Sequence, residues 1–372
     1  MSSEFRILDY NYLFAAVTLT PSSEDPSFPV ENISHFHRSK RWHSSGTFVI
    51  DATNNKINFK DSGGGSELTG TIASGTYTPT TLAAAIDTAL EAAGGANYTV
   101  AYSETTGKWT ITSDGAFLSI LWLTGTNTAT AVHTTIGFAV ADSTGAVTYT
   151  GANIAIHTEE SVVIDVGATE PINSFAILFD RYLGSGLTSN AVLKLQANAS
   201  NSWSSPSVDV TLAVDSNWDI VTHFFSSNQS YRYWRVKIVD TANPNFYVSL
   251  PTIFLSLATQ LTQQPEMGVA LGRRDYSRST RTPYGHRYSD TYPTLRSFRF
   301  AYANLTEADL QTLELIYERV GSVTPIMVCL DPTAVVFDKD RFALYGHLQE
   351  DMGAENQFYT YFNVPLTLEE AA

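Results

Sequence analysis

The clearest pattern of apolar and polar positions lies in residues 230–239, which read Ser-Tyr-Arg-Tyr-Trp-Arg-Val-Lys-Ile-Val. In an extended chain Trp234, Val236 and Ile238 fall on one side, and polar neighbours fall on the other. The stretch is aromatic and β-branched and contains neither Gly nor Pro. It therefore predicts a central strand whose Trp234 side faces the core of a β-sandwich.

Apolar segments on both sides of this strand predict its neighbours, which are residues 161–166, 172–179, 191–197, 246–250 and 251–255. Four segments resemble the discoidin family of galactose-binding-like β-sandwiches: Ile-Asp-Val-Gly at 164–167, Phe-Ala-Ile-Leu at 175–178, Val-Leu-Lys-Leu-Gln-Ala at 192–197 and Tyr-Arg-Tyr-Trp-Arg-Val at 231–236. Residues 21–33 further resemble a segment of phage tail proteins that carry a variant of this sandwich. The resemblance implies glycan-binding loops at one end of the sandwich, with Trp42 and Trp203 as possible stacking residues.

The composition changes between the early and late sandwich segments. Residues 52–157 are rich in Thr, Ala, Ser and Gly, and alternating segments predict strands at 56–59, 67–73, 98–102, 109–111 and 117–122. Leu82, Ile86 and Leu90 lie at i, i+4 and i+8, which predicts a helix that Thr80 or Thr81 caps and Gly94 ends. A short helix is expected at about 128–136. We interpret this stretch as an α+β domain inserted in a sandwich loop, and its pattern resembles one found in phage virion proteins.

A polar segment, residues 258–265, is typical of a linker, and a third unit follows it. A helix is predicted between Thr306 as N-cap and Gly321 as terminator. Its expected buried stripe is Leu310, Leu313, Tyr317 and Val320, and strands are expected at 295–302, 324–330, 335–338, 341–349 and 358–368. This arrangement resembles the β-barrel-plus-helix module of phage tail-tube and distal-tail proteins.

The expected fold is therefore mainly β and multi-domain. It combines a discoidin-like β-sandwich (1–51 plus 158–258), the α+β insert (52–157), and a last unit (259–372) with linker, arm and a tail-module-like β-barrel with one helix.

Positive charge is concentrated in residues 273–299, which hold seven of the chain's 22 Lys and Arg residues, although the formal net charge is −15. Tyrosines are interleaved with the arginines, and Pro283 and Gly285 interrupt any regular pattern, so an irregular extended arm is expected. Arg and Tyr are enriched among the hot-spot residues that contribute most of the binding energy at protein interfaces. The predicted subunit interface consists of Arg273, Arg274, Tyr276, Arg278, Arg281, Tyr284, Arg287 and Tyr288. The alternative is a solvated loop.

Several function classes are disfavoured. The acidic balance argues against nucleic acid or an anionic membrane surface as the main partner, and no apolar run reaches membrane-spanning length. The N-terminus lacks the pattern of a signal peptide, so an unprocessed chain is expected. The single Cys329 lies in an apolar run and is expected in a core.

The sequence offers no recognisable catalytic, metal or cofactor site. The catalytic and phosphate-binding motifs are missing, and adjacent Glu159 and Glu160 point to opposite faces of a strand. His35, His37 and His43 lack a completing ligand and are interpreted as polar loop residues. We expect no enzyme activity, no metal and no cofactor.

The resemblances imply a structural protein of a phage tail tip or baseplate, located in the virion tail and assembled in the host cytoplasm. Its partners would be other tail proteins and further copies of itself in a ring, with six copies favoured and three as the alternative. The second hypothesis is a carbohydrate-binding receptor-recognition protein, such as a tail fibre or adhesin, with a host-surface glycan as partner. A polysaccharide-degrading enzyme is the third, but the sequence offers it no acid pair.

Overall fold

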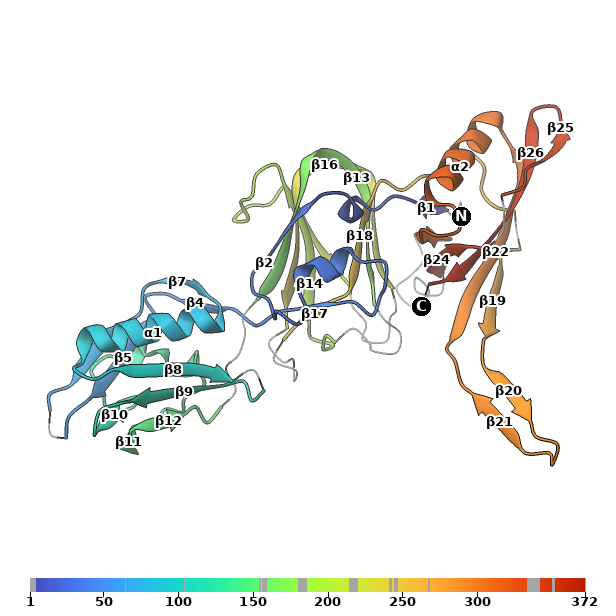
Figure 1. Ribbon diagram of the computed structural model, residues 1–372. Coiled ribbons are helices and arrows are strands. Elements are labelled where there is room, and N and C mark those ends of the chain that lie inside the picture. Colours follow the sequence, from blue (N-terminus) through green and yellow to red (C-terminus); the bar gives the residue numbers. More distant parts are fainter. Residues whose placement is uncertain are drawn as a thin grey trace.

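The computed structural model describes residues 5–63, 65–103, 105–153, 155, 159–179, 186–213, 220–240, 243, 247–266, 268–332, 342–349 and 352–371. Within them the chain is mainly β, with two α-helices and several sheets. Figure 1 shows three units in a row: the insert at one end, a unit consistent with a β-sandwich in the middle, and the C-terminal unit at the other end.

The middle unit is built around one six-stranded sheet in the order β15-β14-β16-β13-β18, with β2 also paired to β13. These strands are β2 (Thr18–Pro21), β13 (Glu160–Leu178), β14 (Val192–Asn198), β15 (Val208–Leu212), β16 (Ile220–Val239) and β18 (Thr252–Ser256). A short pair, β3 (Trp42–His43) with β17 (Ser249–Leu250), and the 3-10 turns η1 (Tyr12–Phe14) and η2 (Val30–Ser34) complete it. The predicted core face is confirmed, because Trp234, Val236 and Ile238 are each 0% exposed.

The insert contains two small sheets in the orders β11-β10-β5-β6 and β12-β9-β8, and a pair of β4 with β7. Its strands are β4 (Phe48–Ile50), β5 (Lys56–Lys60), β6 (Leu68–Thr71), β7 (Gly75–Tyr77), β8 (Tyr98–Ser103), β9 (Lys108–Ser113), β10 (Leu118–Ile120), β11 (Ser143–Ala146) and β12 (Thr148–Thr150). Helix α1 (Pro79–Ala93) buries Leu82, Ile86 and Leu90, as predicted.

Two local expectations for the insert are wrong. Helix α1 is capped by Thr78, which forms a capping box with Thr81, because the helix begins at Pro79 and leaves Thr80 and Thr81 inside its first turn. The short helix expected at about 128–136 is replaced by two 3-10 turns, η3 (Thr128–Thr130) and η4 (Val132–Thr134).

The C-terminal unit is a seven-stranded sheet in the order β1-β23-β24-β26-β22-β19, with β25 also paired to β26. Its strands are β1 (Arg6–Leu8), β19 (Ala270–Asp275), β22 (Thr294–Leu305), β23 (Ile326–Cys329), β24 (Ala343–Leu348), β25 (Glu355–Phe358) and β26 (Tyr361–Glu370). Helix α2 (Glu307–Val320) has the predicted N-cap Thr306, and Gly321 ends it with a φ of 53°. The strand expected at 335–338 lies outside the described residues.

Side-chain burial in this unit follows the sequence pattern with one exception. In α2, Ile316 is buried, whereas the expected Tyr317 is only partly buried. Cys329 is 0% exposed, in agreement with the expected core position.

At the boundaries between the three units, several segments pack in a different unit from the one that the sequence pattern predicts. Phe48 and Ile50 pack in the core of the insert, so that core begins before residue 52. Strand β1 pairs with β23, which places the N-terminal strand in the C-terminal sheet. Residues 258–265 are not a free linker, because Thr259 bridges to Ile7 and Leu261 is buried at 6% exposed.

The middle and C-terminal units share a continuous apolar contact. One buried cluster combines Leu178 and Phe254 of the middle unit with Met327 and Tyr345 of the C-terminal sheet. The hydroxyl of Tyr345 also donates to the backbone oxygen of Phe36 over 3.0 Å. Among the described residues, by contrast, no core cluster contains side chains of both the insert and the middle unit.

Candidate functional site

The arm predicted from the sequence is a regular β-hairpin, which we define as residues 276–292. Strands β20 (Arg278–Arg281) and β21 (Arg287–Asp290) pair antiparallel, and Thr282 and His286 close the turn. Gly285, with a φ of 85°, takes the left-handed backbone that this tight turn needs. The expectation of an irregular arm is therefore wrong, because Pro283 and Gly285 both fall within the turn. Figure 1 shows β20 and β21 projecting from the C-terminal unit, at the end away from α2.

The base of the arm is tied to the C-terminal sheet through Glu369. The hydroxyl of Tyr276 donates a short hydrogen bond to this carboxylate, which raises the pKa of Tyr276. Arg274 Nη1 lies 3.7 Å from Glu369 Oε2, and its guanidinium carbon lies 4.9 Å from the centre of the Tyr276 ring. Arg273 is exposed and lies directly across from Arg296. Arg274 and Tyr276 thus already have partners within the chain.

The outer part of the arm is almost fully solvated. Tyr284 is 91% exposed and Tyr288 is 67% exposed. Arg278, Arg281 and Arg287 are exposed and form no ion pair with any residue that the structure describes. Of the predicted interface residues, these five and the exposed Arg273 have no side-chain partner among the described residues, so they are available to contact another molecule.

Not every arginine of the 273–299 stretch belongs to this surface. Arg296 is 6% exposed, and its Nη2 lies 2.9 Å from Glu370 Oε1. Burial opposes the charge of Glu370, but the charge and hydrogen bonds of Arg296 together with the charge of Arg38 outweigh it and lower the pKa of that carboxyl. Arg296 is therefore part of the core of the C-terminal unit.

The two tryptophans proposed for glycan stacking lie in different environments. Trp42 is 0% exposed, and its Nε1 donates to the backbone oxygen of Ser23 over 3.2 Å. The expectation that Trp42 contacts a glycan is wrong, because a ring without accessible surface cannot stack on a sugar. Trp203 is half-buried, and its Nε1 donates to Asn201 Oδ1 over 2.8 Å. The guanidinium carbon of Arg235 lies 4.7 Å from the centre of the Trp203 ring.

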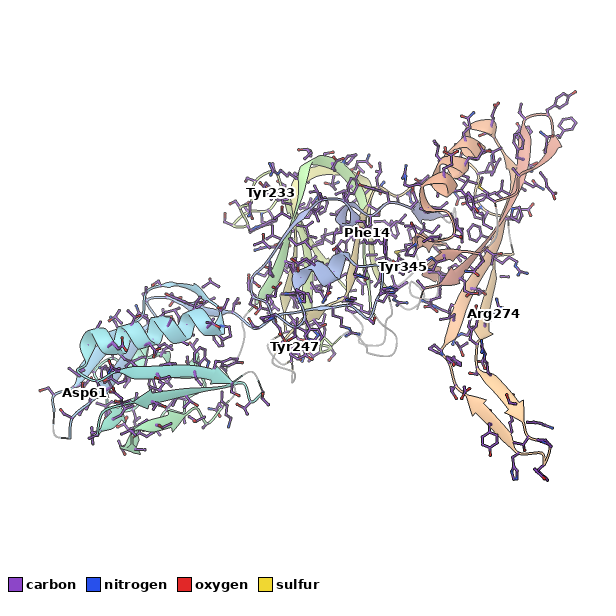
Figure 2. All side chains as sticks on the ribbon, in the orientation of Figure 1. Phe14, Asp61, Tyr233, Tyr247, Arg274 and Tyr345 are labelled. Carbon is purple, nitrogen blue, oxygen red and sulfur yellow. The ribbon has the colours of Figure 1, made fainter. Side chains whose placement is uncertain are left out.

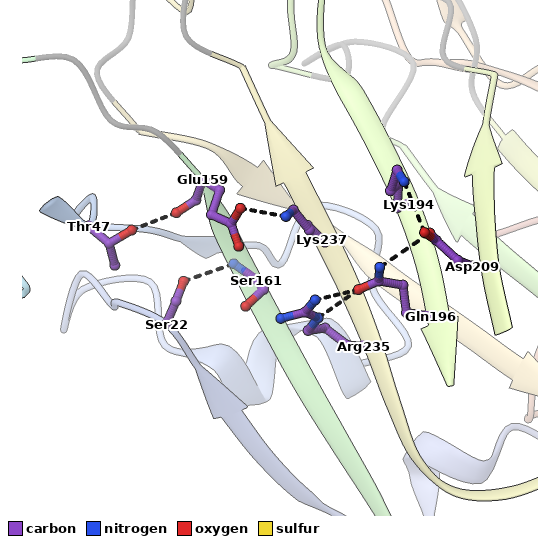
Figure 3. A network of polar contacts seen from close by, with 9 residues as sticks. All are labelled: Ser22, Thr47, Glu159, Ser161, Lys194, Gln196, Asp209, Arg235 and Lys237. Atoms are coloured by element: carbon purple, nitrogen blue, oxygen red, sulfur yellow. Dashed lines mark hydrogen bonds and ion pairs between the residues drawn. The ribbon is translucent and has the colours of Figure 1, made fainter. Parts of the chain in front are cut away.

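A chain of polar side chains leads away from Arg235 over the sheet face (Figure 3). Arg235 Nε and Nη2 donate to Gln196 Oε1 over 2.8 and 2.5 Å, and Gln196 Nε2 donates to Asp209 Oδ1 over 3.2 Å. Lys194 Nζ lies 3.1 Å from Asp209 Oδ2 and lowers the pKa of that carboxyl. Half-burial lowers the pKa of Arg235. The sheet face beside Trp203 therefore carries a connected row of polar and charged side chains.

The carboxylates Glu159 and Glu160 point to opposite sides, as their positions on a strand predict. Glu159 Oε2 lies 2.5 Å from Lys237 Nζ, whereas Glu160 is 1% exposed and accepts hydrogen bonds from Ser22 and Ser23. Burial raises the pKa of Glu160 to about 7. They cannot act together on one substrate.

Among the described residues, no three His, Cys, Asp or Glu side chains are grouped so that they could hold a metal ion. Neither described helix is long and apolar enough to cross a membrane.

One aromatic cluster was not indicated by the sequence. The ring of His43 lies between Phe28 and Tyr247, with centroid separations of 3.9 and 4.4 Å. Phe28 is 41% exposed and Tyr247 is 37% exposed. No signal in the sequence connects these residues, because a backbone hydrogen bond from His43 to Phe28 and the pairing of β3 with β17 bring them together.

Comparison with known proteins gives little guidance. No family model and no curated protein matches the chain. Among solved structures, the chain shows a weak similarity to CBM32-1 from a family 31 glycoside hydrolase from Clostridium perfringens. The sequences are 15% identical, the TM-score is 0.20, and the match covers 26% of this chain and 68% of that chain. A likeness of this size supports no assignment, and nothing in these comparisons supports the resemblance to phage tail proteins.

Proposed function

We propose that this protein is a structural subunit of a phage tail tip or baseplate, which joins further copies of itself through the outer part of the arm. The observation that carries the proposal is the solvated hairpin itself. It presents three unpaired arginines and the exposed rings of Tyr284 and Tyr288 on a chain whose net charge is −15. Arg and Tyr of this kind bind by bidentate hydrogen bonds to carboxylates and by ring stacking.

The way the arm is mounted also favours assembly. Its base is held by Glu369, and the C-terminal unit packs against the middle unit through a buried cluster. A projecting element on a rigid base can dock on a neighbour at a smaller entropic cost than a disordered loop. Contacts in which a projection of one copy binds a different surface of the next copy close into rings when the rotation between copies divides a full turn, and otherwise form open filaments. Six copies are favoured and three are the alternative.

Self-association is tested by light scattering after gel filtration of the full chain. The wild type is expected to elute as an oligomer, and the triple variant Arg278→Ser, Arg281→Ser, Arg287→Ser as a monomer with an unchanged melting temperature. The matched control replaces three lysines outside the arm by serine, Lys40, Lys60 and Lys108, and should still assemble. A monomeric wild type at all concentrations, or an assembled triple variant, contradicts the proposal.

The location is tested separately. A mass-spectrometric inventory of purified phage particles should contain this chain in several copies per particle. Its absence from the particles would overturn the tail assignment even if the chain self-associates.

Glycan binding is the second candidate, and the surroundings of Trp203 favour it. A half-buried indole lies beside Arg235, and Arg235 leads through Gln196 to the exposed Asp209, so the surface combines a ring with polar groups. Calorimetric titration with a panel of mono- and oligosaccharides tests it. Binding should be lost in Trp203→Ala and retained in Trp203→Phe, which keeps an aromatic ring. If no sugar binds the wild type, this candidate fails.

A further inference from the structure

The hairpin arm contains a pair of like charges that face each other. In the antiparallel register Arg281 lies directly opposite Arg287, so both side chains emerge on the same face of the hairpin. Directly opposed residues have Cβ atoms about 5 Å apart, and like charges in such a pair repel each other. No carboxylate of the described chain compensates them. Arg278 lies opposite Asp290 in the register, on the other face of the hairpin, and the two form no ion pair in the structure.

Helix α2 carries a matching arrangement of opposite sign. Its buried side is formed by Leu310, Leu313, Ile316 and Val320, and its exposed side carries Glu307, Glu314 and Glu318. None of these three glutamates forms an ion pair with another residue that the structure describes. Glu314 and Glu318 are four residues apart, so their Cβ atoms lie about 5–6 Å apart on one face, a spacing at which like charges also repel.

An apolar side chain flanks this acidic face. Leu315 is 60% exposed and lies next to Glu314 and Glu318 on the outer side of α2. At the turn of the arm, Tyr284 is 91% exposed and follows closely after Arg281. The arm and the exposed side of α2 thus each combine one like-charged pair with one exposed apolar or aromatic side chain.

Several other surface carboxylates already accept hydrogen bonds from within the chain. Asp61 accepts from the backbone of Gly95, Asp114 accepts from Asn97, and Asp142 accepts from Thr124. These hydrogen bonds already occupy their oxygens, whereas the carboxylates of α2 face solvent.

We infer that the outer face of α2 is the docking surface for the arm of a second copy of this chain, with Arg281 and Arg287 on Glu314 and Glu318. This inference rests on the proposed self-association and names its receiving surface. The carboxylates of Glu314 and Glu318 would reduce the repulsion between Arg281 and Arg287. The two arginines would in turn reduce the repulsion between the two glutamates. Figure 1 shows the arm and α2 at opposite ends of the C-terminal unit, which suits a contact between successive copies.

The experiment exchanges the charges of the two surfaces in the full chain. The arm variant carries Arg281→Glu and Arg287→Glu, and the helix variant carries Glu314→Arg and Glu318→Arg. Each alone should be monomeric at the concentration where the wild type is fully assembled. A chain that carries all four substitutions should assemble again, and so should an equimolar mixture of the arm and helix variants. Circular dichroism and melting curves verify that each variant is folded.

The matched control for the helix variant is Glu31→Arg with Glu91→Arg, which changes the net charge equally at exposed sites elsewhere. It should assemble like the wild type. If the arm variant dissociates but the helix variant assembles, or if the four substitutions fail to restore assembly, the docking surface is not α2, although the proposed self-association stands. If the wild type itself is monomeric, the proposed self-association fails, and this inference fails with it.

Discussion

Arg38 and Glu370 are separated by 332 residues, yet Arg38 Nη1 donates to Glu370 Oε1 over 3.2 Å, with both side chains 6% exposed. Arg38 also donates to the backbone oxygen of Phe179, and Arg296 binds the same carboxylate. One buried carboxylate therefore pairs with a cation of the middle unit and with a cation of the C-terminal unit. This contact reinforces the apolar junction between the two units.

Glu370→Gln should destabilise this junction strongly. The substitution keeps the shape of the side chain but removes the negative charge that the buried Arg38 and Arg296 share, which costs roughly 3–5 kcal/mol. Scanning calorimetry should show a lower melting temperature and a lower unfolding enthalpy. The exposed Glu355→Gln is the control and should melt like the wild type. Equal melting temperatures for the two variants would show that the buried charges are solvated or compensated in another way.

The carboxyl of Glu160 should make stability depend on pH. Burial raises its pKa from 4.5 to about 7, and the nearby Glu159 acts in the same direction. The stability that the protonated form provides is complete below pH 4.5 and is lost as the pH rises through about 7. The free energy of unfolding of Glu160→Gln should therefore exceed that of the wild type by a margin that grows over this range to roughly 3 kcal/mol.

Urea denaturation at several pH values measures this margin. Glu159→Gln is the control, because that carboxylate is partly solvated and paired with Lys237. A margin that does not change between pH 4 and 8 would mean that Glu160 ionises at its ordinary pKa in the folded chain.

Replacing Trp42 and Trp203 by alanine should lower the stability of the protein by different amounts, because one ring is in the core and the other is at the surface. Trp42→Ala removes a fully buried ring and should cost about 3–5 kcal/mol. Trp203→Ala removes a half-buried ring whose main contact is the guanidinium of Arg235, and should cost about 1 kcal/mol. Thermal melts of both variants test the difference. Equal costs would contradict the distinct environments of the two rings.

Two variants that lack the insert, and differ only in where the deletion begins, should differ in solubility. Thr47 Oγ1 donates to the backbone oxygen of Glu159 over 2.5 Å, so the chain leaves and re-enters the middle unit at adjacent points. Replacing residues 48–157 by a short Gly-Ser bridge should leave a soluble remainder with a cooperative melt. Deleting only residues 53–157 should produce aggregation, because Phe48 and Ile50 then lose the core that buries them. Equal behaviour of the two deletions would contradict this border.

Local sequence determined the elements that depend on near neighbours. The alternation around Trp234 specified a strand and its buried side, and the spacing of Leu82, Ile86 and Leu90 specified α1, because side-chain periodicity is a local property of strands and helices. The signals Thr306 and Gly321 likewise fixed both ends of α2, since capping uses residues within one turn.

Tertiary structure decided what depends on distant partners. The burial of Trp42, the pairing of β1 with β23 and the capture of Phe48 by the insert follow from contacts that no local pattern contains. The composition located the arginines of the arm, but only the hairpin register placed Arg281 opposite Arg287, and only the packing of α2 exposed Glu314 and Glu318 together. A charge pattern shows which side chains can attract each other, whereas the fold decides which of them remain unpaired and face solvent.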